Sequence, residues 1–198
     1  MYDHREGEAM ADEIFTRLPD NETRLLTCKQ VCKFFGGIDA STLYRGIGAG
    51  RYLVPLKVGA NSSRWLREEC EAALAEMMVN GRGGKCDHLE AMALFERAAG
   101  KGHIGAMFAL GILRGGGYEV PMDRALAQRW LRAAAERGHA EAQRILGRYL
   151  ARGLAGDRDP DSARLWLGRA AAQGLTDARL ELACLGPATQ AANSRRLI

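Results

Sequence analysis

The sequence lacks any apolar run close to the ~20 residues that a membrane-spanning helix needs, which argues against a membrane protein. Its first residues, Met-Tyr-Asp-His-Arg-Glu-Gly-Glu, are charged and do not form a secretory signal. Cysteine is scarce and odd in number, with 5 in 198 residues, which does not suit a disulfide-bonded extracellular domain. These absences predict free thiols in a reducing compartment, the cytoplasm or the nucleus.

The short motifs that mark catalytic and cofactor sites are also missing. There is no Gly-x-x-x-x-Gly-Lys-Ser/Thr phosphate loop and no Gly-x-Ser-x-Gly nucleophile turn. Cys28 and Cys32 share one face of a predicted helix, but zinc needs two further ligands and none stands at a suitable spacing. We therefore interpret these cysteines as small buried residues, and we expect no enzymatic activity, metal or cofactor.

Neither sign of charge is in strong excess. The formal net charge is +4, from 28 basic and 24 acidic residues. This balance lacks the electrostatic footprint of a specific nucleic-acid-binding protein, so we expect binding to nucleic acid to be weak. Hydrophobic residues make up 47% of the chain, which is enough for a globular core.

The sequence does contain a repeat, with a period of 36 residues, between Asp87 and Leu185. A fixed period of this length predicts an array of stacked structural units, each built from the same secondary structure. The residues that recur at this spacing are Asp87, Asp123 and Asp159; Leu94, Trp130 and Trp166; Gly102, Gly138 and Gly174; and Leu110, Leu146 and Leu182.

Each repeat carries the signals of two helices. In the second repeat Asp123 precedes a helical pattern in which Trp130 and Leu131 belong to one apolar stripe that we expect to be buried. Gly138 then ends the helix, because glycine accepts the left-handed conformation that follows many helices. A second, shorter helical pattern follows. The fold class that these signals predict is all-α, a helix-turn-helix repeat solenoid with a small N-terminal helical module.

Three stretches, 95–106, 130–147 and 166–178, also resemble a known family. They are similar to the core of the Sel-one-like repeat (SLR), a relative of the tetratricopeptide repeat, and the resemblance covers about residues 67–186. It implies adaptor work, since such arrays assemble protein complexes. The spacing itself places the repeats at about 67–102, 103–138 and 139–174, with a closing helix near 176–185.

His103 and His139 stand at equivalent positions, directly after the glycines that end helices. Equivalent positions in stacked units lie on successive turns of the array and do not surround one ion. We therefore expect each histidine to make a cap or loop hydrogen bond.

Residues 12–35 show two short helical patterns divided by Pro19. The segment 12–45 resembles an F-box, most closely at Val31-Cys32-Lys33 and the aromatic residue after it. The resemblance implies docking to the Skp-type adaptor of a cullin ubiquitin ligase through exposed apolar side chains. In the alternative, the same side chains turn inward against Trp65 and cap the array. The contacts implied by the resemblance are Leu18, Pro19, Leu25, Leu26, Val31, Cys32 and Phe35.

Composition divides the rest of the chain. Residues 1–11 and 187–198 show no periodicity, and we expect mobile tails there. Glycines punctuate residues 46–62, which we interpret as a connector with one or two short helices. A helical pattern starts at Ser63 and continues into the first repeat, so the predicted array spans 63–186.

Arg144, Arg148 and Arg152 are spaced by four and share one face of a predicted helix. One repeat earlier, the first two of these positions hold Phe108 and Ile112. Helical arrays bind partners along their concave surface, so these five residues form a candidate groove for a peptide with apolar and acidic side chains. In the alternative, the arginines are a solvated stripe and the two apolar residues belong to the core.

We interpret the chain as a scaffold for protein–protein interaction that binds other proteins or peptides. The F-box resemblance implies a subunit that recruits substrates to a ubiquitin ligase. Two alternatives stay open: a repeat scaffold without a link to ubiquitin, and an RNA- or anion-binding helical array that uses the arginines. A hydrolase has the least support, because no serine motif is present.

Overall fold

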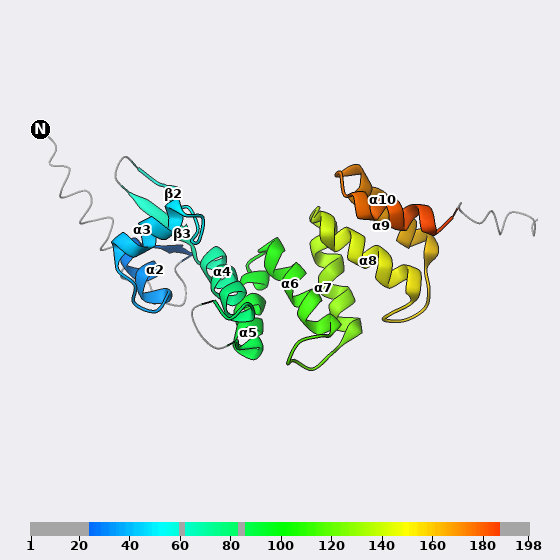
Figure 1. Cartoon of the computed structure of the whole chain (residues 1–198), viewed down its shortest axis with the longest axis horizontal. Coiled ribbons are helices and arrows are strands. Elements are labelled where there is room, and N and C mark those ends of the chain that lie inside the picture. Colours follow the sequence, from blue (N-terminus) through cyan, green and yellow to red (C-terminus); the bar gives the residue numbers. More distant parts are fainter. Residues whose placement is uncertain (1–23, 60–61, 83–85, 187–198) are drawn as a thin grey trace, which may run out of the picture.

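The computed structural model describes residues 24–59, 62–82 and 86–186, in which a small N-terminal module leads into a long array of helices (Figure 1). The predicted contacts Leu18 and Pro19 lie outside the described residues. The module contains β1 (Leu25–Leu26), α2 (Cys28–Phe34), α3 (Ala40–Gly48), β2 (Leu56–Lys57) and β3 (Ser63–Leu66). The array contains α4 (Arg67–Val79), α5 (His88–Gly100), α6 (Ile104–Gly115), α7 (Arg124–Glu136), α8 (Ala140–Arg152), α9 (Pro160–Ala172) and α10 (Thr176–Cys184).

Each helix of the array packs against the helices that precede and follow it in the sequence. Helices α4 and α5, α6 and α7, and α8 and α9 form three pairs, and α10 follows the third pair. Figure 1 shows the N-terminal module at one end of the molecule and α10 near the other. This arrangement confirms the predicted helical repeat solenoid. Within the described part of the chain, every helix is too short or too polar to cross a membrane.

The starts of the helices follow from the aspartates that recur in the sequence. The carboxylates of Asp87, Asp123 and Asp159 each accept the backbone N–H three residues on, at 2.9, 2.9 and 3.0 Å. Pro160 is the first residue of α9, where an N–H would find no partner within the helix. Each of these helices ends before a glycine with positive φ, which turns the chain toward the next helix: Gly102 (94°), Gly138 (91°) and Gly174 (96°).

Within a pair, a leucine of the second helix fills a space beside a glycine of the first. A Cβ on Gly111 of α6 would lie 2.7 Å from Cγ of Leu131 on α7. A Cβ on Gly147 of α8 would lie at the same distance from Cγ of Leu167 on α9. The missing side chain therefore lets the two helices approach closely, and both leucines are almost fully buried.

Trp130 is less buried than the apolar stripe predicts. Its equivalents Leu94 and Trp166 are 8% and 5% exposed, whereas Trp130 is only partly buried against the core. The next residue, Leu131, has no exposed surface. The inner face of α7 is set by the leucine that meets Gly111, so the tryptophan lies toward the edge of that face.

The N-terminal module contains a three-stranded antiparallel sheet that the hydrophobic pattern does not predict. Its strand order is β1-β3-β2, and Leu26 of β1 lies opposite Trp65 of β3. The predictions that Leu25 and Leu26 belong to a helix, and that a helix begins at Ser63, are therefore wrong. The helical prediction for the array itself holds from Arg67.

Local hydrogen bonds explain these boundaries. The side chain of Thr27 accepts the N–H of Gln30 at 3.3 Å, and the Gln30 side chain accepts the N–H of Thr27 at 2.8 Å. This capping box starts α2 after Leu26 and leaves the two leucines free to pair as a strand. Asp39 caps α3 through the N–H three residues on, at 2.9 Å. Helix α3 continues to Gly48 and therefore crosses the boundary predicted from the sequence between the module (12–45) and the connector (46–62).

The core of the module contains three of the side chains that the F-box resemblance exposes to a partner. Leu26, Val31 and Cys32 are 2%, 0% and 9% exposed, so the expected exposure is corrected for all three. They pack in one cluster with Trp65 and with Cys70 of α4, which joins the module to the array. They face inward because, with Leu43, they form the core of the module, against which its other apolar side chains pack. Two further implied contacts are partly buried, Leu25 and Phe35.

The cysteines of this cluster lie in an apolar setting. Burial raises the pKa of the Cys32 thiol, and the neighbouring Cys28 raises it further. Burial also raises the pKa of Cys70 to about 12, so this thiol stays protonated. Cys32 is buried as predicted, and Cys28 is partly buried. In the part of the chain that the structure describes, no three His, Cys, Asp or Glu side chains are grouped to hold a metal ion.

Candidate binding groove between α8 and α10

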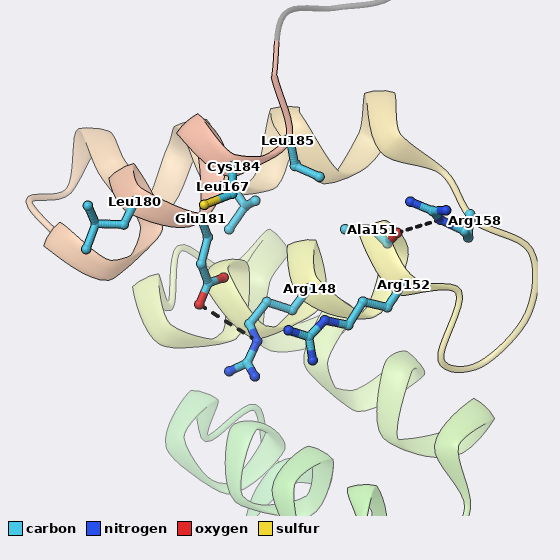
Figure 2. Close-up of a pocket in the computed structure, with 9 residues that line it drawn as sticks. All are labelled: Arg148, Ala151, Arg152, Arg158, Leu167, Leu180, Glu181, Cys184 and Leu185. Atoms are coloured by element: carbon cyan, nitrogen blue, oxygen red, sulfur yellow. Dashed lines mark hydrogen bonds and ion pairs between the residues drawn. The ribbon is translucent and has the colours of Figure 1, made fainter.

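A groove opens between α8 and α10, with α9 beneath it (Figure 2). Its volume is about 450 Å³, and Arg158 of the loop between α8 and α9 is one of the residues that line it. Two of the five residues of the predicted groove line it, Arg148 and Arg152. The complete lining consists of Arg148, Ala151, Arg152, Arg158, Leu167, Leu180, Glu181, Cys184 and Leu185.

One wall of the groove is basic. Arg148 and Arg152 project from successive turns of α8 (Figure 2). Arg158 follows in the loop, and its Nε donates a hydrogen bond to the carbonyl of Ala151 at 2.9 Å, which fixes it at the end of α8. Arg152 makes no hydrogen bond or ion pair with any described residue, so its charge is available to a ligand.

Glu181 of α10 reaches across the groove toward the arginines. Its Oε1 lies 2.8 Å from Nη1 of Arg144 and 3.7 Å from Nε of Arg148. Arg144 also pairs with Glu141 at 2.9 Å, and its side chain is only 15% exposed. Burial alone would lower the pKa of Arg144, but hydrogen bonds to the two carboxylates outweigh burial and raise the pKa. Arg144 is thus neutralised within the array, whereas the looser contact of Arg148 leaves it able to meet a second anion.

Apart from Glu181, the opposite wall is apolar, because α10 departs from the repeat. Three positions of α8 that hold two arginines and a tyrosine are occupied, 36 residues later, by two leucines and a cysteine. Shifting the sequence by 36 residues reveals this departure, although the charge pattern of α8 alone does not. Leu180 is 67% exposed, so this wall offers apolar surface to a partner. The replacements are Leu180 for Arg144, Cys184 for Arg148 and Leu185 for Tyr149.

The apolar members of the predicted groove lie elsewhere. Phe108 and Ile112 are partly buried on α6 and pack against the core of the array. The ring of Phe108 also stacks on His139, with centroids 4.5 Å apart and planes at 21°. The structure does not bring these residues to the arginines, because the apolar surface beside Arg148 and Arg152 comes from the following helix of the array.

His103 and His139 make the cap hydrogen bonds that their positions predict. Nδ1 of His103 accepts the N–H of Ala106 at 3.0 Å, and Nδ1 of His139 accepts the N–H of Ala142 at 3.2 Å. An imidazole nitrogen accepts a hydrogen bond only when it carries no proton. Burial lowers the pKa of His139, and the nearby Glu141 only partly offsets this, so the environment favours the neutral ring that the cap requires.

Lowering the pH from about 8 to about 5 is expected to destabilise the array at His139. Since the pKa of His139 in the folded chain lies below the ordinary 6.5, the unfolded chain takes up the proton first, and stability is lost as the pH falls through 6.5. The variant His139→Asn keeps a capping side chain that does not titrate. It should lose less stability over this range in urea unfolding, and equal losses in both proteins would contradict the assignment.

A second hollow, of about 570 Å³, lies beside α2. Lys29 and Lys33 line it one turn apart, and Leu26 contributes to its floor while remaining 2% exposed. No other implied F-box contact among the described residues lines this hollow. With Val31 and Cys32 buried in the core, the F-box interpretation and docking to a Skp-type adaptor find no support.

Comparison with known proteins matches the repeats directly. A family model described as Sel1 repeat matches three adjoining segments, residues 68–103, 104–139 and 140–175, each one residue later than the spacing predicts. Together the segments cover more than half of the chain. The search of curated proteins found no match to the chain.

Several solved structures are similar to the chain, and two of them are the following. A Sel1 repeat protein from Oxalobacter formigenes is 35% identical, with a TM-score of 0.55, over 60% of this chain and 34% of that one. The protein c5321, described as a protective antigen of uropathogenic Escherichia coli strains with an SLR fold, is 22% identical. Its TM-score is 0.59, over 80% of this chain and 32% of that one, and this likeness shows the fold alone. The chain spans about a third of the length of both.

Proposed function

The chain belongs to the Sel1 repeat family, and on that premise we propose that it is a scaffold that binds a partner protein in the groove between α8 and α10. Sel1 repeat proteins generally act as scaffolds for protein–protein interaction and are generally not enzymes. The bound segment is a peptide that carries both acidic and apolar side chains.

The observation that carries this proposal is the pairing of a basic and an apolar wall in one groove. Arg148 and Arg152 supply donors that suit peptide carboxylates. Across from them, Leu180 and Leu185 supply apolar surface that gains free energy when a ligand covers it. A ligand that satisfies both walls must carry charged and apolar groups side by side, which a peptide does.

A nucleic acid or a free anion suits this groove less well. Glu181 places a carboxylate between the arginines, and it already partners Arg144 and Arg148. Binding to a phosphate backbone depends on several cations that are free to replace counterions. One wall of the groove would also stay without a complementary surface, so the geometry favours a peptide over the RNA- or anion-binding alternative.

Reversing the charge of Arg148 and Arg152 together to glutamate is expected to weaken peptide binding by at least about tenfold, or ~1.4 kcal/mol. The change replaces attraction for the peptide carboxylates by repulsion. The probe is a fluorescent synthetic peptide in which apolar residues alternate with aspartate, titrated with the full-length protein and followed by anisotropy.

A matched control reverses Arg124 and Arg129, which are exposed on α7 and lie outside the groove. It changes the net charge by the same amount, so near-wild-type affinity is expected. Equal weakening by the two pairs would show that binding follows overall charge, and the groove would lose its assignment.

A further inference from the structure

One repeat before the groove, the corresponding space lies between α6 and α8, and there it is filled by a side chain. There the side chain of Tyr149 on α8 is 8% exposed. Its hydroxyl oxygen lies 2.7 Å from the point where a Cβ on Gly115, the last residue of α6, would stand. The aromatic ring therefore bridges the two helices and closes the interval.

Thirty-six residues later, the same two positions hold Leu185 and Ala151, and both line the groove. Leu185 directly follows α10 and keeps helical backbone angles, with φ −73° and ψ −12°. Its backbone conformation therefore matches that of Tyr149 within α8, but a leucine side chain is shorter than that of a tyrosine. The groove corresponds to the space of an aromatic ring that α10 does not supply.

Ala151 limits what can fill this space. Gly115 has no side chain, and that absence leaves room for the Tyr149 hydroxyl. Ala151 carries a Cβ at the equivalent point, so a hydroxyl placed in the same way would lie 2.7 Å from carbon, closer than the 3.0 Å below which real Cβ contacts are essentially never found. An aromatic ring without a hydroxyl avoids this clash.

We propose that the groove accepts the side chain of a phenylalanine from the partner peptide, with an acidic residue of the peptide beside it. The inference rests on the proposed function and names the chemistry of its ligand. The ring lies between Ala151, Leu167 and Leu185. The carboxylate pairs with Arg152, which has no partner among the described residues, and with Arg148, whose contact with α10 is long.

Three labelled peptides test the inference. They share one sequence of eleven residues with two aspartates on each side of the central position, which is phenylalanine, tyrosine or alanine. With the full-length protein, the phenylalanine peptide should bind tightest. The tyrosine peptide should bind about tenfold more weakly because its hydroxyl meets Ala151, and the alanine peptide more weakly still.

Two variants of the protein sharpen the test. Ala151→Gly recreates the setting of Gly115 and should bring the affinity for the tyrosine peptide up to that for the phenylalanine peptide. Leu185→Phe should place a ring of the protein itself in the groove and weaken the phenylalanine peptide by at least about tenfold. Far-UV circular dichroism checks that both variants keep their helices.

The outcomes separate this inference from the proposed function. If the three peptides bind alike and all respond to reversal of Arg148 and Arg152, the phenylalanine inference is overturned and the proposed function stands. If the tyrosine peptide matches the phenylalanine peptide in the unaltered protein, the inference is overturned as well. If no peptide binds, both proposals fall.

Discussion

Replacing Trp65 by alanine is expected to lower the free energy of unfolding by about 3–5 kcal/mol. Its side chain is 1% exposed and belongs to the cluster that joins the N-terminal module to α4. Its Nε1 donates a hydrogen bond to the carbonyl of Leu53 at 2.9 Å, so the substitution leaves both a cavity and an unpaired carbonyl. Urea unfolding followed by circular dichroism measures the loss.

Trp130→Ala is the matched control, because it makes the same chemical change where the ring is only partly buried. Its cost should be at most about half that of Trp65→Ala, since less apolar surface returns to water. A cost as large as that of Trp65→Ala would contradict the burial described for the two rings.

Replacing Leu131 by alanine is expected to cost about 2–5 kcal/mol. Leu131 has no exposed surface and fills the space beside Gly111, so its loss opens a cavity between α6 and α7. Gly111→Ala alone should also destabilise, by about 1–3 kcal/mol, because the new Cβ is forced against Leu131.

Combining the two changes should make Gly111→Ala much less destabilising. Once Leu131→Ala has removed the leucine side chain, the new Cβ meets only the backbone nitrogen of residue 131 at 3.3 Å, and the gain in helix propensity offsets this remaining contact. A double-mutant cycle in urea measures this coupling. If Gly111→Ala has the same effect with and without Leu131→Ala, the close contact between the two residues does not exist.

The array could be predicted from the sequence because its stabilising contacts recur every 36 residues. Asp123 and Gly138 mark the start and the end of α7 through hydrogen bonding and backbone conformation, which depend on local sequence. The burial of Trp130 could not be judged in the same way. Two adjacent apolar residues both fit a helical stripe, and only the position of Gly111 on the neighbouring helix decides which one enters the core.

The N-terminal sheet could not be predicted from the sequence because its strands are too short to show an alternating pattern. Leu25 and Leu26 form all of β1, and their backbone partners are Trp65 and Leu66, far along the chain. A pair of leucines before a helix reads equally well as the first turn of that helix. The direction in which such side chains face depends on the tertiary partner, which the apolar pattern does not contain.

Two of the residues that line the groove were named from the sequence, and the rest of the lining was not. Arg148 and Arg152 stand out because helical spacing puts them on one face, but the neutralisation of Arg144 depends on Glu181, which belongs to the next repeat. The apolar wall arises from substitutions in α10 relative to α8. Leu180 and Leu185 do not stand out in the sequence unless the two helices are aligned. A comparison of each repeat with the next would have located this wall.

The pairing of β1 with β3 also sets an order of folding. Adjacent helices of the array meet after short loops, so each pair can form as a local unit and guide the next one. Leu26 and Trp65 are separated in the sequence by α2, α3 and β2. Closing the longer loop costs more conformational entropy. Refolding should therefore begin in the repeats, and the sheet, together with the cluster around Trp65, should form last.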